Sequence, residues 1–179
     1  MRTDRKTAIV LIDVQGKLAE IMYESDKLID SLEILIKGAQ LLDIPIVWTE
    51  QLPEKLGTTT ERIGKLLENQ NPIIKSEFSC VKNAEFSAFI KNNKYNHFVL
   101  CGIETHVCVY QTAKDLLALG HEVEIIIDGV SSRTELNKDI GIEKITSLGA
   151  KVTSVEMQLF EKQEIAVGDK FRELIKIIK

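Results

Sequence analysis

The chain has 179 residues, the length of one ordinary domain, so we expect residues 1–179 to form a single unit. Its net charge is −4 with scattered Lys and Arg, which argues against nucleic acid as a partner, and its longest apolar runs are too short to span a membrane. The three cysteines lack C-x-x-C spacing, which argues against a disulfide framework or a structural zinc site. The polar N-terminal stretch has no apolar signal-peptide core, so we expect a cytoplasmic protein.

Short apolar segments alternate with helical patterns along the chain. Runs that are apolar at nearly every position are typical of parallel strands buried on both faces, and they cover residues 8–13, 44–49, 72–74, 97–101, 122–127 and 151–155. Apolar residues at helical spacing cover residues 28–42, 109–117, 140–148 and 171–178. This alternation predicts an α/β fold, a Rossmann-like three-layer sandwich in which helices cover both faces of a six-stranded parallel sheet.

Three polar residues lie where such a sheet places its ligands, at the carboxyl ends of the strands. Asp13 ends the first predicted strand, Lys75 follows the third, and Cys108 lies just beyond the fourth. Each has a plain structural alternative: a helix cap, a solvated lysine and a small core residue. Thr105 fits a helix N-cap, which would place Cys108 in the first helical turn, where the helix dipole and a nearby ammonium favour a thiolate. A neighbouring carboxylate could then move the proton.

Several segments of the sequence resemble the isochorismatase-like cysteine hydrolases. The most specific is CGIETHVCVYQTA at residues 101–113, supported by LIDVQ at 11–15 and by IK at 74–75. TEQLPEKLG at 49–57 and DGVSSR at 128–133 are more similar to the isochorismatase-domain-containing proteins, whose substrates are largely undefined. The resemblance runs in order along nearly the whole chain.

This resemblance implies a role for each of the three residues. Asp13 would be the general base and acid, Lys75 its electrostatic partner and Cys108 the nucleophile. It also implies a cis peptide between Ile103 and Glu104, and an oxyanion hole formed by the backbone amides of Glu104 and Cys108. Members of the family commonly form dimers or larger assemblies, so we expect a homo-oligomer.

Further residues are candidates for the substrate pocket, with ordinary packing as the alternative. They are Gln15, Trp48, Gln51, Phe78, Thr105 and His106. Gln15, by the resemblance, orients Asp13 or its loop. Metal-binding nicotinamidases of the family carry an aspartate and histidines after the second strand, whereas residues 49–54 read TEQLPE. We therefore expect no metal and no other cofactor.

These features favour one function and leave two alternatives open. The leading hypothesis is hydrolysis of a small amide or related C–N substrate through an acyl-thioester on Cys108. One alternative is hydrolysis of an isochorismate-type vinyl ether, which need not use the cysteine. The other is a catalytically idle protein that binds a metabolite or a partner protein. The sequence does not specify which small molecule is the substrate.

Overall fold

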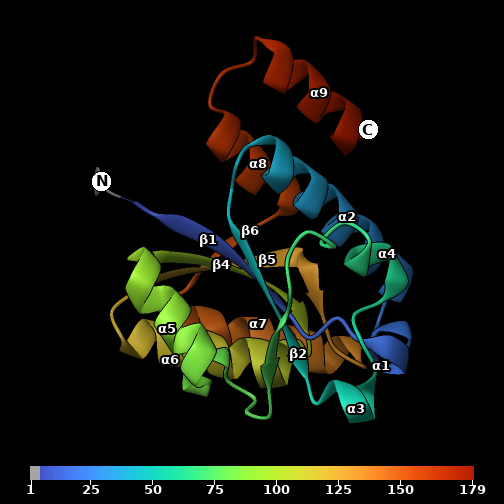
Figure 1. Ribbon diagram of the computed structural model, residues 1–179, viewed down its shortest axis with the longest axis vertical. Coiled ribbons are helices and arrows are strands. Elements are labelled where there is room, and N and C mark those ends of the chain that lie inside the picture. Colours follow the sequence, from blue (N-terminus) through green and yellow to red (C-terminus); the bar gives the residue numbers. More distant parts are fainter. Residues whose placement is uncertain (1–4) are drawn as a thin grey trace.

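A six-stranded sheet forms the centre of the computed structural model, which describes residues 5–179 (Figure 1). All neighbouring strands pair in parallel, in the spatial order β3-β2-β1-β4-β5-β6. The strands are β1 (Thr7–Ile12), β2 (Ile46–Gln51), β3 (Ile73–Lys75), β4 (His97–Ile103), β5 (Glu122–Ser131) and β6 (Lys151–Thr153). The predicted fold class is therefore confirmed.

The ends of β5 and β6 differ from the prediction, each for a local reason. β5 runs to Ser131 because its register with β4 shifts, so that pairing resumes at Gly102 and Val130 after an irregular stretch. β6 ends at Thr153 because Ser154 is the N-cap of the next helix, with its hydroxyl oxygen accepting a hydrogen bond from the Met157 amide at 3.2 Å. Residue 155 is therefore helical and not the end of a strand.

Helices cover both faces of the sheet. In Figure 1, α2, α8 and α9 lie on one side, and α5, α6 and α7 lie on the other. The helices are α1 (Gly16–Glu20), α2 (Ser25–Leu41), α3 (Pro53–Leu56), α4 (Glu61–Gly64), α5 (Ala84–Asn93), α6 (Tyr110–Ala118), α7 (Glu135–Ser147), α8 (Val155–Gln163) and α9 (Asp169–Ile178), with a 3-10 turn η1 (Cys80–Lys82) and a π-helical turn η2 (Thr105–Val109). Within residues 5–179, no helix combines the length and apolar character needed to cross a membrane.

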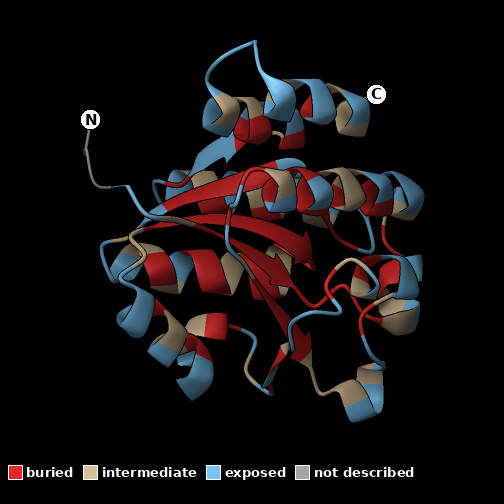
Figure 2. Cartoon of the chain, turned by 45° about the horizontal axis from the view of Figure 1, so that its top comes forward, coloured by how far each residue is buried: buried red, intermediate tan, exposed pale blue. Residues whose placement is uncertain are grey.

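The hydrophobic core has two parts, one on each side of the sheet, and the central strands β1 and β4 between them are almost entirely buried (Figure 2). Along β1, Ile9 and Leu11 point to the side of α2, while Val10 and Ile12 point to the side of α5 and α6. This alternation is the two-residue period of a strand. Because both faces are covered, β1 is apolar at nearly every position, and this pattern is what predicted a strand here.

The strand order reverses direction beside β1. The chain moves outward from β1 to β3 and then returns to form β4 on the other side of β1, so the carboxyl ends of β1 and β4 flank the switch point at which open α/β sheets bind ligands. Gly102 makes this approach close: its φ is +108°, and a Cβ at this position would lie 2.1 Å from the backbone oxygen of Ile12. The residue after Ile12 is Asp13, so the packing at Gly102 brings Asp13 beside the segment that follows β4.

Candidate active site

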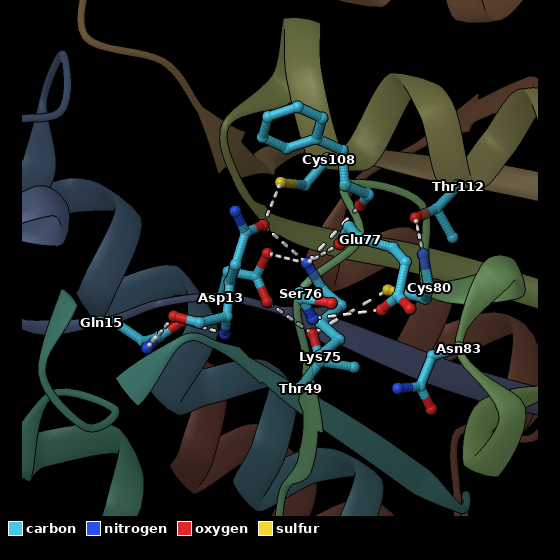
Figure 3. A network of polar contacts seen from close by, with 12 residues as sticks. Asp13, Gln15, Thr49, Lys75, Ser76, Glu77, Cys80, Asn83, Cys108 and Thr112 are labelled. Carbon is cyan, nitrogen blue, oxygen red and sulfur yellow. Dashed lines mark hydrogen bonds and ion pairs between the residues drawn. The ribbon is translucent and has the colours of Figure 1, made fainter. Parts of the chain in front are cut away.

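Asp13, Lys75 and Cys108 come together at this edge of the sheet (Figure 3). The Lys75 ammonium Nζ lies 2.5 Å from Asp13 Oδ2, and the side chains of the two residues are 0% and 4% exposed. Gln51 Oε1 accepts hydrogen bonds from Lys75 Nζ at 3.0 Å and from Cys108 Sγ at 3.3 Å. Residues that are far apart in the sequence thus form one continuous set of polar contacts.

Asp13 follows β1 with a left-handed backbone, φ +53°. Its carboxylate accepts a hydrogen bond from Thr49 Oγ1 at 2.7 Å in addition to the contact with Lys75. Burial raises the pKa of Asp13 above its ordinary value, and this effect outweighs the lowering by Lys75, Thr49 and Cys108. The carboxylate is therefore a stronger base than an exposed aspartate.

Lys75 is the last residue of β3, directly opposite Gln51 of β2 in the sheet register. Besides Asp13 and Gln51, its Nζ donates to the backbone oxygen of Glu77 at 3.1 Å. Burial by itself lowers the pKa of Lys75, but the negative charge of Asp13 leads the opposing effects, which leave the pKa raised overall. With the Phe78 backbone oxygen at 3.5 Å as a fourth acceptor, each of the three ammonium protons has a partner, so the charged form is satisfied.

Cys108 is the fourth residue of η2, and α6 continues from this turn. Thr105 is not the N-cap that we predicted: Glu104 occupies that position, and the buried Thr105 hydroxyl has no hydrogen-bond partner within the described part of the chain. Burial raises the pKa of the Cys108 thiol, the charge of Asp13 raises it further, and Lys75 offsets only part of this. These surroundings, which we expected to favour a thiolate, thus favour the neutral thiol in the resting site.

The turn that carries Cys108 begins with a cis peptide bond between Ile103 and Glu104, at the position that the resemblance implies. The Glu104 carboxylate accepts hydrogen bonds from the backbone amide of Arg133 at 3.0 Å and from Arg133 Nε at 3.1 Å. His106 Nδ1 lies 3.0 Å from Ser132 Oγ, so His106 contacts the loop after β5. These contacts tie the turn to the segment between β5 and α7.

The remaining pocket candidates occupy different surroundings. Gln15 is fully buried and binds backbone: its Nε2 donates to the oxygens of Gln51 (3.1 Å) and Gly57 (2.6 Å), and its Oε1 accepts from the Gln51 amide (2.6 Å). It therefore orients the loop after β2. Phe78 is half exposed, and its backbone oxygen lies 3.5 Å from Lys75 Nζ.

Trp48 does not lie at the site. It is inside β2 and packs in the core on the side of α2, because β2 continues to Gln51 and does not end at residue 49 as predicted. The sequence reasoning also missed Thr49 as the hydrogen-bond partner of Asp13. Thr49 pairs with Ile12 in the register of β1 and β2, and a polar residue at that point of a buried strand was the available signal.

Metal-ligating side chains do not gather anywhere in residues 5–179: no three His, Cys, Asp or Glu residues are placed so that they could hold an ion together. Asp13 is surrounded by Lys75, Thr49 and Cys108, and the Lys75 ammonium lies beside its carboxylate. That the protein works without a metal stays a prediction.

Comparisons with known proteins identify the family of this chain. The family model of the isochorismatase domain matches residues 7–157. The secreted isochorismatase effector Isc1 of Phytophthora sojae is 34% identical over 177 residues, which cover 97% of this chain and 84% of that protein. The structure of MAR1 ribonuclease from Caenorhabditis elegans is 32% identical with a TM-score of 0.89, covering 97% of this chain and 89% of that one.

A more distant structure shares the fold. The YcaC gene product of Escherichia coli, described as an octameric hydrolase of unknown specificity, superposes with a TM-score of 0.89 at 18% identity, over 96% of this chain and 87% of that one. At this identity the likeness shows the fold alone.

Proposed function

Because the chain belongs to the isochorismatase family, we propose that it hydrolyses a small amide or a related C–N compound, with Cys108 as the nucleophile. One observation carries the proposal: a thiol, a carboxylate and an ammonium, all buried, meet at the switch point of the sheet through Gln51. A neutral thiol beside a carboxylate of raised pKa is suited to proton transfer between the two.

In the first half-reaction, Asp13 takes the proton from Cys108 as the sulfur attacks the carbonyl carbon of the substrate. The backbone amides of Glu104 and Cys108 receive the developing oxyanion. The intermediate then collapses, Asp13 gives the proton to the leaving nitrogen, and an acyl-thioester remains on Cys108. Lys75 stabilises the Asp13 carboxylate whenever it is ionised.

In the second half-reaction, water attacks the thioester carbon and gives its proton to Asp13. The acid product leaves, and the proton returns to the Cys108 sulfur, which restores the resting state. Asp13 therefore acts in both halves, as base and then as acid.

Hydrolysis of a vinyl ether is the second candidate. The raised pKa of Asp13 favours it, because an acid that holds its proton longer can protonate the double bond. In this reaction Cys108 has no covalent role. RNA is a poor candidate substrate for this chain, since its net charge is −4 and nucleic-acid-binding proteins carry basic surfaces.

Two variants separate the candidates. If the reaction is acyl transfer, Cys108→Ser should lower the turnover of a small amide by at least about a thousandfold, roughly 4 kcal/mol of barrier, and Asp13→Asn should be about as damaging. If it is vinyl-ether hydrolysis, Asp13→Asn should abolish turnover while Cys108→Ser leaves it largely intact. Cys101→Ala, which removes a buried thiol of β4, is the matched control.

The assay is turnover of the best substrate from a screen of small amides and imides, with intact-mass detection of an acyl adduct. Circular dichroism confirms that the variants fold equally. Near-wild-type amide turnover by Cys108→Ser would overturn the thioester mechanism.

We also propose that the protein acts in the cytoplasm as a dimer or larger homo-oligomer, with no nucleic-acid or membrane partner. Leu136 and Ile140, one turn apart on α7, are 68% and 42% exposed, which supports a contact between copies on this helix. Light scattering tests the assembly, and a monomer at micromolar concentration would contradict it.

A further inference from the structure

The side chain of Gln51 lies between the proposed nucleophile and the ammonium. Its Oε1 is 3.3 Å from Cys108 Sγ and 3.0 Å from Lys75 Nζ. We propose that Gln51 is a positioning residue whose amide oxygen holds the proton on Cys108 in the resting site and gives way when substrate binds. This inference rests on the proposed function.

The direction of both hydrogen bonds follows from the chemistry of Lys75. An ammonium has only donors, so the Gln51 atom 3.0 Å from Nζ must be the amide oxygen and not the nitrogen. An amide oxygen has no proton, so in its contact with Cys108 the thiol must be the donor. The resting arrangement therefore requires a protonated Cys108.

The backbone of Gln51 is fixed while its side chain spans the site. Gln15 binds both its amide (2.6 Å) and its backbone oxygen (3.1 Å), and Gln51 pairs with Lys75 in the sheet. The amide of the next residue, Leu52, donates to the Lys75 backbone oxygen at 3.0 Å. Only the side chain of Gln51 is thus free to turn away from Cys108 when a substrate enters.

Three ionisable groups act on the Cys108 thiol: Asp13 after β1, Lys75 at the end of β3 and Cys80 of η1. When Gln51 Oε1 leaves, the thiol loses an acceptor that stabilises its protonated form, and the Lys75 ammonium gains a free donor. Both changes favour the thiolate. The S–H bond then breaks, the proton moves to the Asp13 carboxylate, and the sulfur electron pair forms the bond to the substrate carbonyl carbon while the C=O pair moves to oxygen.

Substitutions of Gln51 with opposite electrostatic character test the proposal. Gln51→Leu removes the acceptor at nearly constant volume and should increase the alkylation rate of Cys108 by iodoacetamide about tenfold, the effect of one pKa unit. Gln51→Glu keeps the size and the acceptor but adds a negative charge, and should decrease the rate about tenfold. Gln70→Leu, the same change at an exposed position, should leave the rate unchanged.

The measurement is the rate of labelling of the Cys108 peptide by mass spectrometry between about pH 6 and 10, where the thiolate fraction sets the rate. The whole profile of rate against pH should move to lower pH for Gln51→Leu and to higher pH for Gln51→Glu. Cys80 and Cys101 should stay unlabelled. A residue with a merely structural role would not move the profile in opposite directions.

Profiles that coincide with the wild type, or that move in the same direction in both variants, would overturn the proposal. If Gln51→Leu fails to fold, Gln51→Met carries the same expectation with an unbranched side chain. The labelling does not depend on turnover, so this outcome is separate from that of Cys108→Ser: loss of amide hydrolysis in Cys108→Ser with unmoved Gln51 profiles would reject the role of Gln51 alone.

Discussion

Removal of the Lys75 ammonium should destabilise the fold strongly, in a way that depends on pH. Lys75→Met takes away the donor that serves Asp13 Oδ2, Gln51 Oε1 and the Glu77 oxygen, and leaves a carboxylate that is 4% exposed with Thr49 as its hydrogen-bond donor. Breaking a buried ion pair by deleting one partner costs about 3–5 kcal/mol. We expect a loss of this size in the free energy of unfolding at alkaline pH.

The sign of the pH dependence follows from the pKa of Asp13. Burial already raises it above its ordinary value of 3.8, and without Lys75 it rises further. In the folded variant, Asp13 therefore keeps its proton at pH values at which it has lost that proton in the unfolded chain. The loss in the free energy of unfolding, relative to the wild type, should be small near pH 4 and should grow by about 1.4 kcal/mol per pH unit. It should level off above the pKa of Asp13 in the folded variant.

Urea unfolding of the wild type and Lys75→Met across this pH range measures the effect, and the double variant Asp13→Leu with Lys75→Met is its control. Because the double variant buries no charge at these positions, it should be about as stable as the wild type and should lack the extra pH dependence. A single variant with wild-type stability at alkaline pH would refute the reasoning, as would a double variant with the same deficit as the single one.

Two further predictions concern the switch point and the general base. Gly102→Ala should lower the free energy of unfolding by more than about 3 kcal/mol, because at φ +108° its Cβ would lie 2.1 Å from the Ile12 oxygen. Gly120→Ala is the control: at φ +81°, with no described atom within 4 Å of the new Cβ, it should cost only about 1 kcal/mol. Equal shifts of the two melting temperatures would contradict this. The kcat/KM of amide hydrolysis should fall with decreasing pH through a midpoint above 3.8, because Asp13 must be ionised to accept the thiol proton and burial raises its pKa; a midpoint at or below 3.8 would argue against Asp13 as the base.

Much of the fold was predictable because it rests on local pattern. Strands covered on both faces are apolar at successive positions, so β1 and β4 could be recognised, and the rule for parallel sheets then gave the edge at which Asp13, Lys75 and Cys108 meet. α5 was missed: its start depends on Asn83, whose side chain accepts hydrogen bonds from two backbone amides.

Other features depend on three-dimensional surroundings that no local pattern contains. Trp48 was placed at the site because the end of β2 was predicted too early, and the end of a strand is set by pairing with β1 and β3. The charge state of Cys108 depends on how burial and Asp13 balance Lys75, and these contributions are fixed only when the strands are assembled. Gln51 could be named as a candidate, but the two hydrogen bonds of its oxygen could not be foreseen.

The strand order also has a consequence for how the chain folds during synthesis. β1 is made before β4, yet one of its edges pairs with that strand, which begins at His97. Until that strand emerges from the ribosome, an apolar strand with unpaired backbone groups stays open on one side, which is the kind of edge that promotes aggregation. This edge of β1 therefore needs protection until β4 has been made, although the other edge can pair earlier with β2. A chaperone that shields this edge would raise the yield of native protein more than one that acts on the completed chain.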